Sequence, residues 1–179
     1  IVEEFAHYKE SCEFLWTVCH FYGFSYKTAV LATAYIQQTL CAVVNYSGTN
    51  YLKWAKSDRM AHVATCILTA VTLYEPRKCS VFDSNALVEN FGEQFEFCRE
   101  DLATIQKMLF KSDITRFDIV TCAVFIDESL RETNTFDKMN VCLLNRDMEN
   151  LGKKSFEHLS VENSLITALA LLQRHKCST

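Results

Sequence analysis

Glycine and proline are scarce in this chain of 179 residues, which contains 4 Gly and 1 Pro. Both residues interrupt regular structure, so their scarcity favours long helices joined by short loops. Gly-rich loops of the kind that cradle phosphates are absent. No stretch alternates between apolar and polar residues for long enough to predict a β-strand. We therefore expect an all-α protein with about eight helices.

Clustered basic residues and long apolar runs are also missing. The formal net charge is −4, and the basic pairs Arg77-Lys78 and Lys153-Lys154 are isolated. A nucleic-acid interface needs a clustered basic surface, so we expect no nucleic-acid partner. The most apolar run, 60–74, contains His62 and is shorter than the roughly 20 residues that cross a bilayer. We therefore expect no membrane partner.

Paired-cysteine motifs are absent, although the chain has nine Cys. No C-x-x-C occurs, and the spacing of His175 and Cys177 matches no common zinc module. We expect no metal and no cofactor. Many of the cysteines stand in apolar helical runs, which is typical of reduced, buried thiols in an intracellular protein.

No set of catalytic residues stands out, so we expect that the protein is not an enzyme. Cys19 and His20 are neighbours in the sequence, and neighbouring side chains on a helix point in different directions. His62 stands within an apolar helix, where a hydrogen-bonded core histidine is a better interpretation than a ligand.

Helical periodicity predicts five helices in the first part of the chain, over 1–22, 25–44, 59–74, from about 84, and over 100–110. Gly23 predicts a tight turn between the first two, Ser25 a cap of the second, and Ser84 a cap of the fourth. The helix over 59–74 is apolar around most of its circumference, and a helix without a polar face must be enclosed by others. We therefore expect it at the centre of a bundle.

Three of these segments resemble helices of the cyclin family. Residues 28–36 (TAVLATAYI) resemble the second-helix motif T-L-x-L-A-x-x-Y-I. Residues 67–76 (ILTAVTLYEP) resemble the third helix, L-L-x-A-S-K-x-E-E-P, and residues 101–110 (DLATIQKMLF) resemble the fifth, E-x-x-I-L-x-x-L-x-F. The resemblance implies a cyclin-like five-helix bundle over 1–111, followed by an incomplete second helical lobe over 112–179.

The resemblance also implies a function, that of a non-catalytic regulatory subunit in the nucleus or cytoplasm that binds a cyclin-dependent kinase. It carries the family's kinase-contacting positions onto six residues of this chain: Thr69, Thr72, Leu73, Asp101, Ile105 and Phe110.

This sequence departs from the family at the charged positions. Cyclins hold the kinase with a Lys on the third helix and a Glu on the fifth, and these positions are Thr72 and Asp101 here. The substrate-docking motif M-R-x-I-L aligns with the polar residues 7–11, which makes docking of R-x-L motifs improbable. Two interpretations stay open: a divergent cyclin that binds a kinase through apolar contacts, or a kinase-independent scaffold that binds another protein. Ile105 and Phe110 are equally well explained as core residues.

Overall fold

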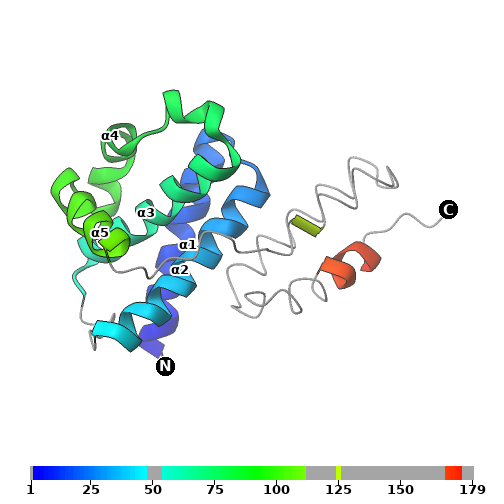
Figure 1. The fold of residues 1–179 in the computed structure, drawn as a ribbon, viewed down its shortest axis with the longest axis horizontal. Coiled ribbons are helices and arrows are strands. Elements are labelled where there is room, and N and C mark those ends of the chain that lie inside the picture. Colours follow the sequence, from blue (N-terminus) through cyan, green and yellow to red (C-terminus); the bar gives the residue numbers. More distant parts are fainter. Residues whose placement is uncertain (1, 48–53, 112–123, 126–167, 175–179) are drawn as a thin grey trace.

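The computed structural model describes residues 2–47, 54–111, 124–125 and 168–174. Its regular structure is entirely helical within these ranges, as predicted. None of the described helices combines the length and hydrophobicity that a membrane crossing requires. The elements follow one another in the order α1 (Val2–Tyr22), α2 (Tyr26–Ser47), α3 (Lys56–Tyr74), the 3-10 helix η2 (Pro76–Ser80), α4 (Ser84–Phe95) and α5 (Arg99–Lys111) (Figure 1).

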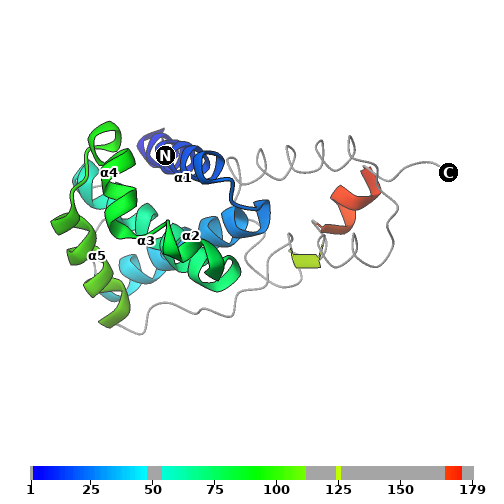
Figure 2. The ribbon, with the colours of Figure 1, turned by 90° about the horizontal axis from the view of Figure 1, so that it is seen from above.

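Helix α3 lies at the centre of this bundle, as its apolar circumference predicted (Figure 1, Figure 2). It contacts α1, α2, α4, α5 and η2. Every side chain from Arg59 to Ile67 is buried, and so are Ala70 and Val71. The three alanines of α3 are fully buried, and such small side chains let neighbouring helices approach closely. Both ends of α3 reach the surface: residues 56–58, Leu68 and Thr69 are partly exposed, and Thr72 and Leu73 are exposed.

The turn between α1 and α2 has the predicted form. Gly23 adopts the left-handed conformation, with a φ of 67°, and the N–H of Phe24 donates to the carbonyl of Cys19 at 2.9 Å. Glycine adopts this conformation without the steric cost that a side chain brings. The hydroxyl oxygen of Ser25 then accepts the N–H of Thr28 at 3.4 Å, which caps the start of α2.

The carboxylate of Glu75 joins this turn to the end of α3. It accepts hydrogen bonds from the hydroxyl of Thr28 at 2.6 Å and from the N–H of Ser25 at 3.3 Å. It also pairs with Lys78 at 3.2 Å, and Lys78 donates to the carbonyl of Gly23 at 2.7 Å. Hydrogen bonds to charged groups are stronger than neutral ones. These contacts therefore fix the α1–α2 turn against the corner between α3 and η2.

The cap of α4 is the residue before the predicted one. Ser84 is the first residue of the helix, and Asp83 precedes it in an extended conformation with a φ of −137°. Oδ1 of Asp83 accepts the N–H of Ala86 at 2.8 Å. Asp and Ser are about equally good caps, so the prediction of Ser84 was wrong because two adjacent residues carried the same signal.

A cluster of buried polar side chains lies between α2 and α3. His62 is fully buried and hydrogen-bonded, as predicted. Thr39 donates its hydroxyl proton to the carbonyl of Tyr35 at 2.7 Å, so its oxygen accepts from Nε2 of His62. The sulfur of Cys66 lies 3.9 Å from the same nitrogen. Burial lowers the pKa of His62 to about 4 and raises the pKa of Cys66 to about 12, so both groups are uncharged at neutral pH.

The cysteines that the structure describes are free thiols. Cys12, Cys19 and Cys66 are buried, as predicted, whereas Cys79 is partly exposed and Cys98 is exposed. The predictions for the side chains of the remaining cysteines lie outside the described residues.

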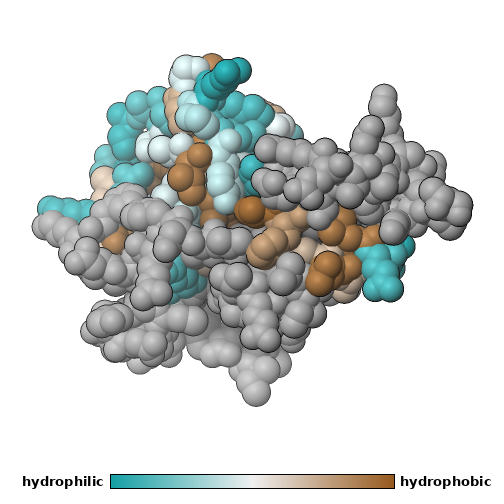
Figure 3. Space-filling view, turned by 45° about the vertical axis from the view of Figure 1, so that its right-hand side comes forward, coloured by the Kyte–Doolittle hydropathy of each residue, from teal (hydrophilic) through white to brown (hydrophobic). Residues whose placement is uncertain are grey.

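The outer face of α2 packs against the short described segments 124–125 and 168–174. Val30 and Ala168 are both buried in a second apolar cluster, and four partly buried residues pack against it: Tyr26, Phe125, Leu171 and Leu172. Figure 3, which brings the right-hand side of Figure 1 forward, shows hydrophobic residues gathered on this side. The prediction of an incomplete second lobe over 112–179 falls mainly outside the described residues.

Gly92 allows a test of how closely α4 packs against the chain that follows it. A Cβ atom at this position of α4 would lie 2.8 Å from the backbone oxygen of Phe97 and 3.2 Å from Cγ1 of Val88. We expect Gly92→Ala to destabilise the protein by about 1–2 kcal/mol in urea unfolding, because overpacking outweighs the roughly 1 kcal/mol gained in helix propensity. Gln94→Ala, at an exposed position of the same helix, is the control and should change stability by less than about 0.5 kcal/mol. Equal stabilities of wild type and Gly92→Ala would contradict the close approach.

The buried histidine predicts a dependence of stability on pH. The pKa of His62 is about 4 when folded, against a model value of 6.5, so the unfolded chain binds the extra proton between these values. The uncharged His62 therefore makes its full contribution to the free energy of unfolding above pH 6.5. This contribution is lost as the pH falls towards 4, by about 3 kcal/mol in all. We expect urea unfolding over this window to show the loss in wild type. His62→Gln keeps a donor for Thr39 but does not titrate, so its stability should fall less steeply; parallel curves would refute the assignment.

Candidate functional site

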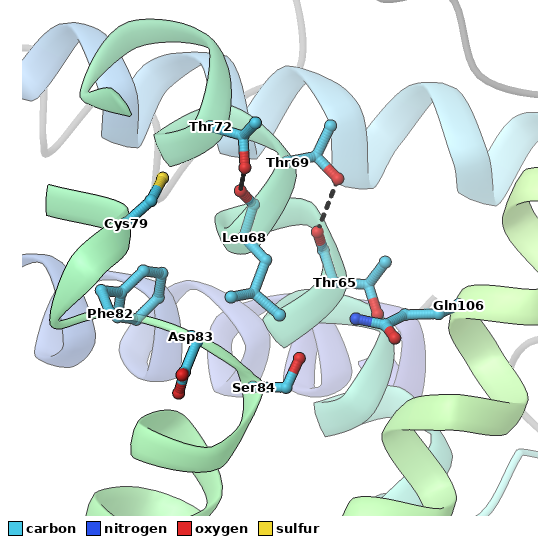
Figure 4. A pocket seen from close by; sticks show the side chains of 9 residues that line it. All are labelled: Thr65, Leu68, Thr69, Thr72, Cys79, Phe82, Asp83, Ser84 and Gln106. Carbon is cyan, nitrogen blue, oxygen red and sulfur yellow. Dashed lines mark hydrogen bonds between the residues drawn. The ribbon is translucent and has the colours of Figure 1, made fainter. Parts of the chain in front are cut away.

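A groove opens on the surface between α3, η2, α4 and α5. Its volume is about 320 Å³. We call it the α3–α5 groove, and Figure 4 shows the nine residues that line it: Thr65, Leu68, Thr69, Thr72, Cys79, Phe82, Asp83, Ser84 and Gln106. The first four come from α3 and the last from α5. Cys79 belongs to η2, Phe82 and Asp83 to the connection between η2 and α4, and Ser84 to the first turn of α4.

The apolar part of the groove consists of Leu68 and Phe82. The ring of Phe82 is 3% exposed and packs edge-on against Phe24, with 4.8 Å between the ring centroids, and against Tyr22, with 4.7 Å. Tyr22 and Phe24 belong to the turn that Glu75 holds in place. The apolar surface of the groove is therefore supported from behind by the α1–α2 turn.

Three threonines of α3 form one wall of the groove. The hydroxyls of Thr65, Thr69 and Thr72 donate to the carbonyls four residues earlier, at 2.8, 2.9 and 2.8 Å. Figure 4 shows the bonds of Thr69 and Thr72. A hydroxyl has one proton and two acceptor lone pairs, so each oxygen is left as an acceptor only. None of the nine lining residues is basic. This wall consequently offers methyl groups and neutral acceptors to a partner, and no charged donor.

The opposite rim is polar and carries the only charged residue of the nine, Asp83. This carboxylate is exposed, and it also caps α4. Ser84, Gln106 and the thiol of Cys79 complete the rim and are all partly exposed. Their groups are small and uncharged, so the groove is suited to hold an apolar or weakly polar side chain of a partner.

The structure brings together only some of the residues that the resemblance selected. Thr69 and Thr72 line the groove. Leu73 follows Thr72 on the last turn of α3 and is 49% exposed, although it does not line the groove. Ile105 is 4% exposed and belongs to the central core, while its neighbour Gln106 reaches the groove. The side chain of Phe110 lies outside the described residues.

Asp101 has a local partner at the start of α5. Its Oδ2 accepts the N–H of Cys98 at 3.0 Å, and the thiol of Cys98 donates to the same oxygen at 3.0 Å. A carboxylate in the first turn that reaches back to the residue before the helix is half of a capping box. This hydrogen bond also raises the pKa of the Cys98 thiol. Asp101 thus stabilises the start of α5 and does not line the groove.

Most of the lining residues that the sequence analysis did not assign to a site lie from η2 to the first residue of α4, namely Cys79, Phe82, Asp83 and Ser84. No periodic pattern marks this connection, so only the folded chain brings it opposite α3. One signal was present on α3 itself. Threonines at 65, 69 and 72 follow helical spacing on an otherwise apolar helix, and this stripe runs from the buried Thr65 to the exposed Thr72.

No group of three or more His, Cys, Asp or Glu side chains comes together as metal ligands in the part of the chain that the structure describes. His62 and Cys66, which lie next to each other on α3, are both buried. Burial raises the pKa of the Cys66 thiol to about 12, whereas a nucleophilic cysteine needs a lowered pKa.

Comparisons with known proteins leave the family open. No protein-family model matches the chain, and no curated protein and no solved structure matches it. These comparisons therefore give no information on the function of the chain.

Proposed function

We propose that the chain is a non-catalytic, cyclin-like regulatory subunit that binds a protein kinase of the cyclin-dependent type through the α3–α5 groove. The resemblance implies both the cyclin-like arrangement and the kinase. It also implies the mechanism, in which the subunit holds a mobile helix of the kinase inward so that the Lys–Glu pair of the kinase can form.

The arrangement of the helices supports this proposal. The third helix is enclosed by the other four, which is what a five-helix cyclin-like bundle requires. The Glu-Pro pair at the end of α3, which is part of the resemblance, has a structural task in this chain. Glu75 holds the α1–α2 turn, and Pro76 begins η2.

The observation that carries the proposal is the position of the groove. It lies between α3 and α5, the helices that bear the family's kinase-contacting positions, and Thr69 and Thr72 are among its lining residues. Apolar surface from Leu68 and Phe82 lies at its base, and the half-exposed Leu73 adjoins it on α3. A concave site with an apolar base and an exposed apolar neighbour is suited to anchor side chains of a partner helix.

The charged residues favour the second interpretation, a kinase-independent scaffold. Thr72 stands where cyclins have a Lys, and its hydroxyl proton is already donated to the carbonyl of Leu68. Asp101, at the position of the Glu, is engaged in the cap of α5. A scaffold that uses the same groove needs neither charge, so identifying the bound protein decides between the two functions.

Leu73 provides the test of the interface. We expect affinity purification of the tagged chain from its native cells, followed by mass spectrometry, to recover a kinase, and Leu73→Asp to reduce its recovery at least tenfold. An unpaired charge at an interface core costs more than the roughly 1.4 kcal/mol that a tenfold change represents. Leu73 is 49% exposed, so the bundle tolerates the change.

The control is Leu169→Asp, because Leu169 is 58% exposed and lies away from the groove. It should leave recovery unchanged. A kinase recovered equally by both variants would reject the groove as its binding site. Another protein that is lost only with Leu73→Asp would establish the scaffold function instead.

Thr72 provides a gain-of-function test. Thr72→Lys introduces the residue that cyclins have at this position, and the side chain is exposed, so a lysine fits without disturbing the core. Hydrogen bonds from a charged donor contribute about 1.5–3 kcal/mol, so we expect affinity for the kinase to rise roughly tenfold. Titration of the purified kinase by calorimetry measures the change. Thr72→Met, of similar length but uncharged, should give no such gain; equal affinities of the two variants would exclude a cyclin-like contact.

A further inference from the structure

The surface segment 77–81, with the sequence RKCSV, places two basic residues shortly before a serine. Arg77 and Lys78 stand three and two positions before Ser80. Among all the serines and threonines of the chain, only Ser80 has Lys or Arg at both of these positions. The basic pair therefore marks one hydroxyl group out of the many in the sequence.

The side chains around Ser80 are open to solvent. Arg77, Ser80 and Val81 are exposed, Val81 to 69%, and no residue of η2 is buried. The hydroxyl of Ser80 donates to the carbonyl of Arg77 at 3.4 Å, which is long for a hydrogen bond between oxygen atoms. An enzyme can therefore reach Ser80, and releasing its hydroxyl from this contact costs little.

The element that carries Ser80 is a short piece of 3-10 helix. Its hydrogen bonds include those from the N–H of Lys78 to the carbonyl of Glu75, at 3.0 Å, and from the N–H of Val81 to the carbonyl of Lys78, at 3.1 Å. Such bonds have poorer geometry than those of an α-helix, and short exposed elements open locally at a low cost in free energy. A modifying enzyme can thus draw this segment into an extended conformation while the helices stay folded.

The buried Phe82 limits how far the segment can be drawn out. Its ring is 3% exposed and packs against the aromatic rings of the α1–α2 turn. Asp83 lies beyond this anchor, and its carboxylate already caps α4. The accessible sequence around Ser80 therefore lies mainly on its N-terminal side and ends with Val81. An enzyme that binds there meets two cations before the serine and one apolar side chain after it.

We propose that Ser80 is a phosphorylation site for a serine/threonine kinase with an acidic substrate cleft, and that Arg77 is the main recognition residue. Arg77 forms no ion pair within the described part of the chain, so its guanidinium is available for bidentate contacts with carboxylates of the cleft. Lys78 contributes less, because it already pairs with Glu75 at 3.2 Å. The one proline of the chain does not follow a serine or threonine, which leaves no site for a proline-directed kinase.

The reaction transfers the γ-phosphoryl group of MgATP to the hydroxyl oxygen of Ser80. A new O–P bond forms while the bond from the γ-phosphorus to the bridging oxygen of the leaving ADP breaks, and the hydroxyl proton passes to a base of the kinase. The phosphate carries a charge of about −1.5 to −2 at neutral pH. Cys79 and Phe82, one residue before and two residues after Ser80, line the α3–α5 groove. The modification therefore adds negative charge close to the rim of the groove.

Phosphorylation of the folded chain tests the site. We expect the catalytic subunit of the cyclic-AMP-dependent protein kinase, which selects basic residues before the acceptor, to phosphorylate Ser80 with MgATP, as located by tandem mass spectrometry. Ser80→Ala should remove this modification. Thr104→Ala, which removes an exposed hydroxyl without basic residues before it, should leave the modification unchanged. A synthetic peptide of residues 74–84 is the positive control, and phosphorylation of this peptide without that of Ser80 in the folded chain would overturn the proposal.

Arg77→Gln tests the recognition. Because a bidentate, charge-assisted pair is lost, we expect kcat/KM for the phosphorylation of Ser80 to fall at least tenfold. Arg99→Gln, at an exposed position of α5, is the control and should leave kcat/KM unchanged. Equal values for Arg77→Gln and wild type would overturn the proposal, and so would faster modification of Ser80 by a kinase that selects carboxylates after the acceptor. These results are independent of the proposed function, whose test is the recovery of a partner by Leu73→Asp.

Discussion

The structure depends on the enclosure of α3. An apolar helix without a polar face is stable only when neighbours cover it, and here four helices and η2 do so. The coverage ends at the last turn, where Thr72 and Leu73 emerge. The buried part must be covered on all sides, and α1, α2, α4 and α5 together with η2 provide this cover. The groove lies at its edge, where the surrounding helices separate.

Glu75 connects this core with the groove. Its carboxylate fixes the α1–α2 turn through Thr28 and Ser25, and the aromatic rings of that turn support Phe82 at the base of the groove. The groove is thus preorganised by contacts made at the α1–α2 turn. Preorganised surfaces lose less free energy to ordering when a partner binds.

The helices and their centre could be predicted because both depend on periodicity. Apolar spacing located the five helices, and the apolar circumference of 59–74 located the core. The predicted cap of α4 was wrong by one residue, because Asp83 and Ser84 are adjacent and both are residue types that favour the N-cap position.

The groove could be predicted only on α3, from the polar stripe of Thr65, Thr69 and Thr72. Its other wall comes from a connection whose position depends on tertiary packing, which no local pattern encodes. The family motif alone could not decide whether Ile105 contacts a partner or belongs to the core, because the same pattern fits both. The structure places its side chain in the core.

The threonine wall has a consequence for the conditions under which the groove can operate. Each hydroxyl is oriented by a carbonyl of its own helix, and neither group gains or loses a proton in the physiological range. Contacts made there are short-ranged and neutral, so added electrolyte does not screen them. The contribution of this wall to the binding of a partner is therefore the same at acidic and neutral pH, and among the nine lining residues only Asp83 adds a contact that salt can screen.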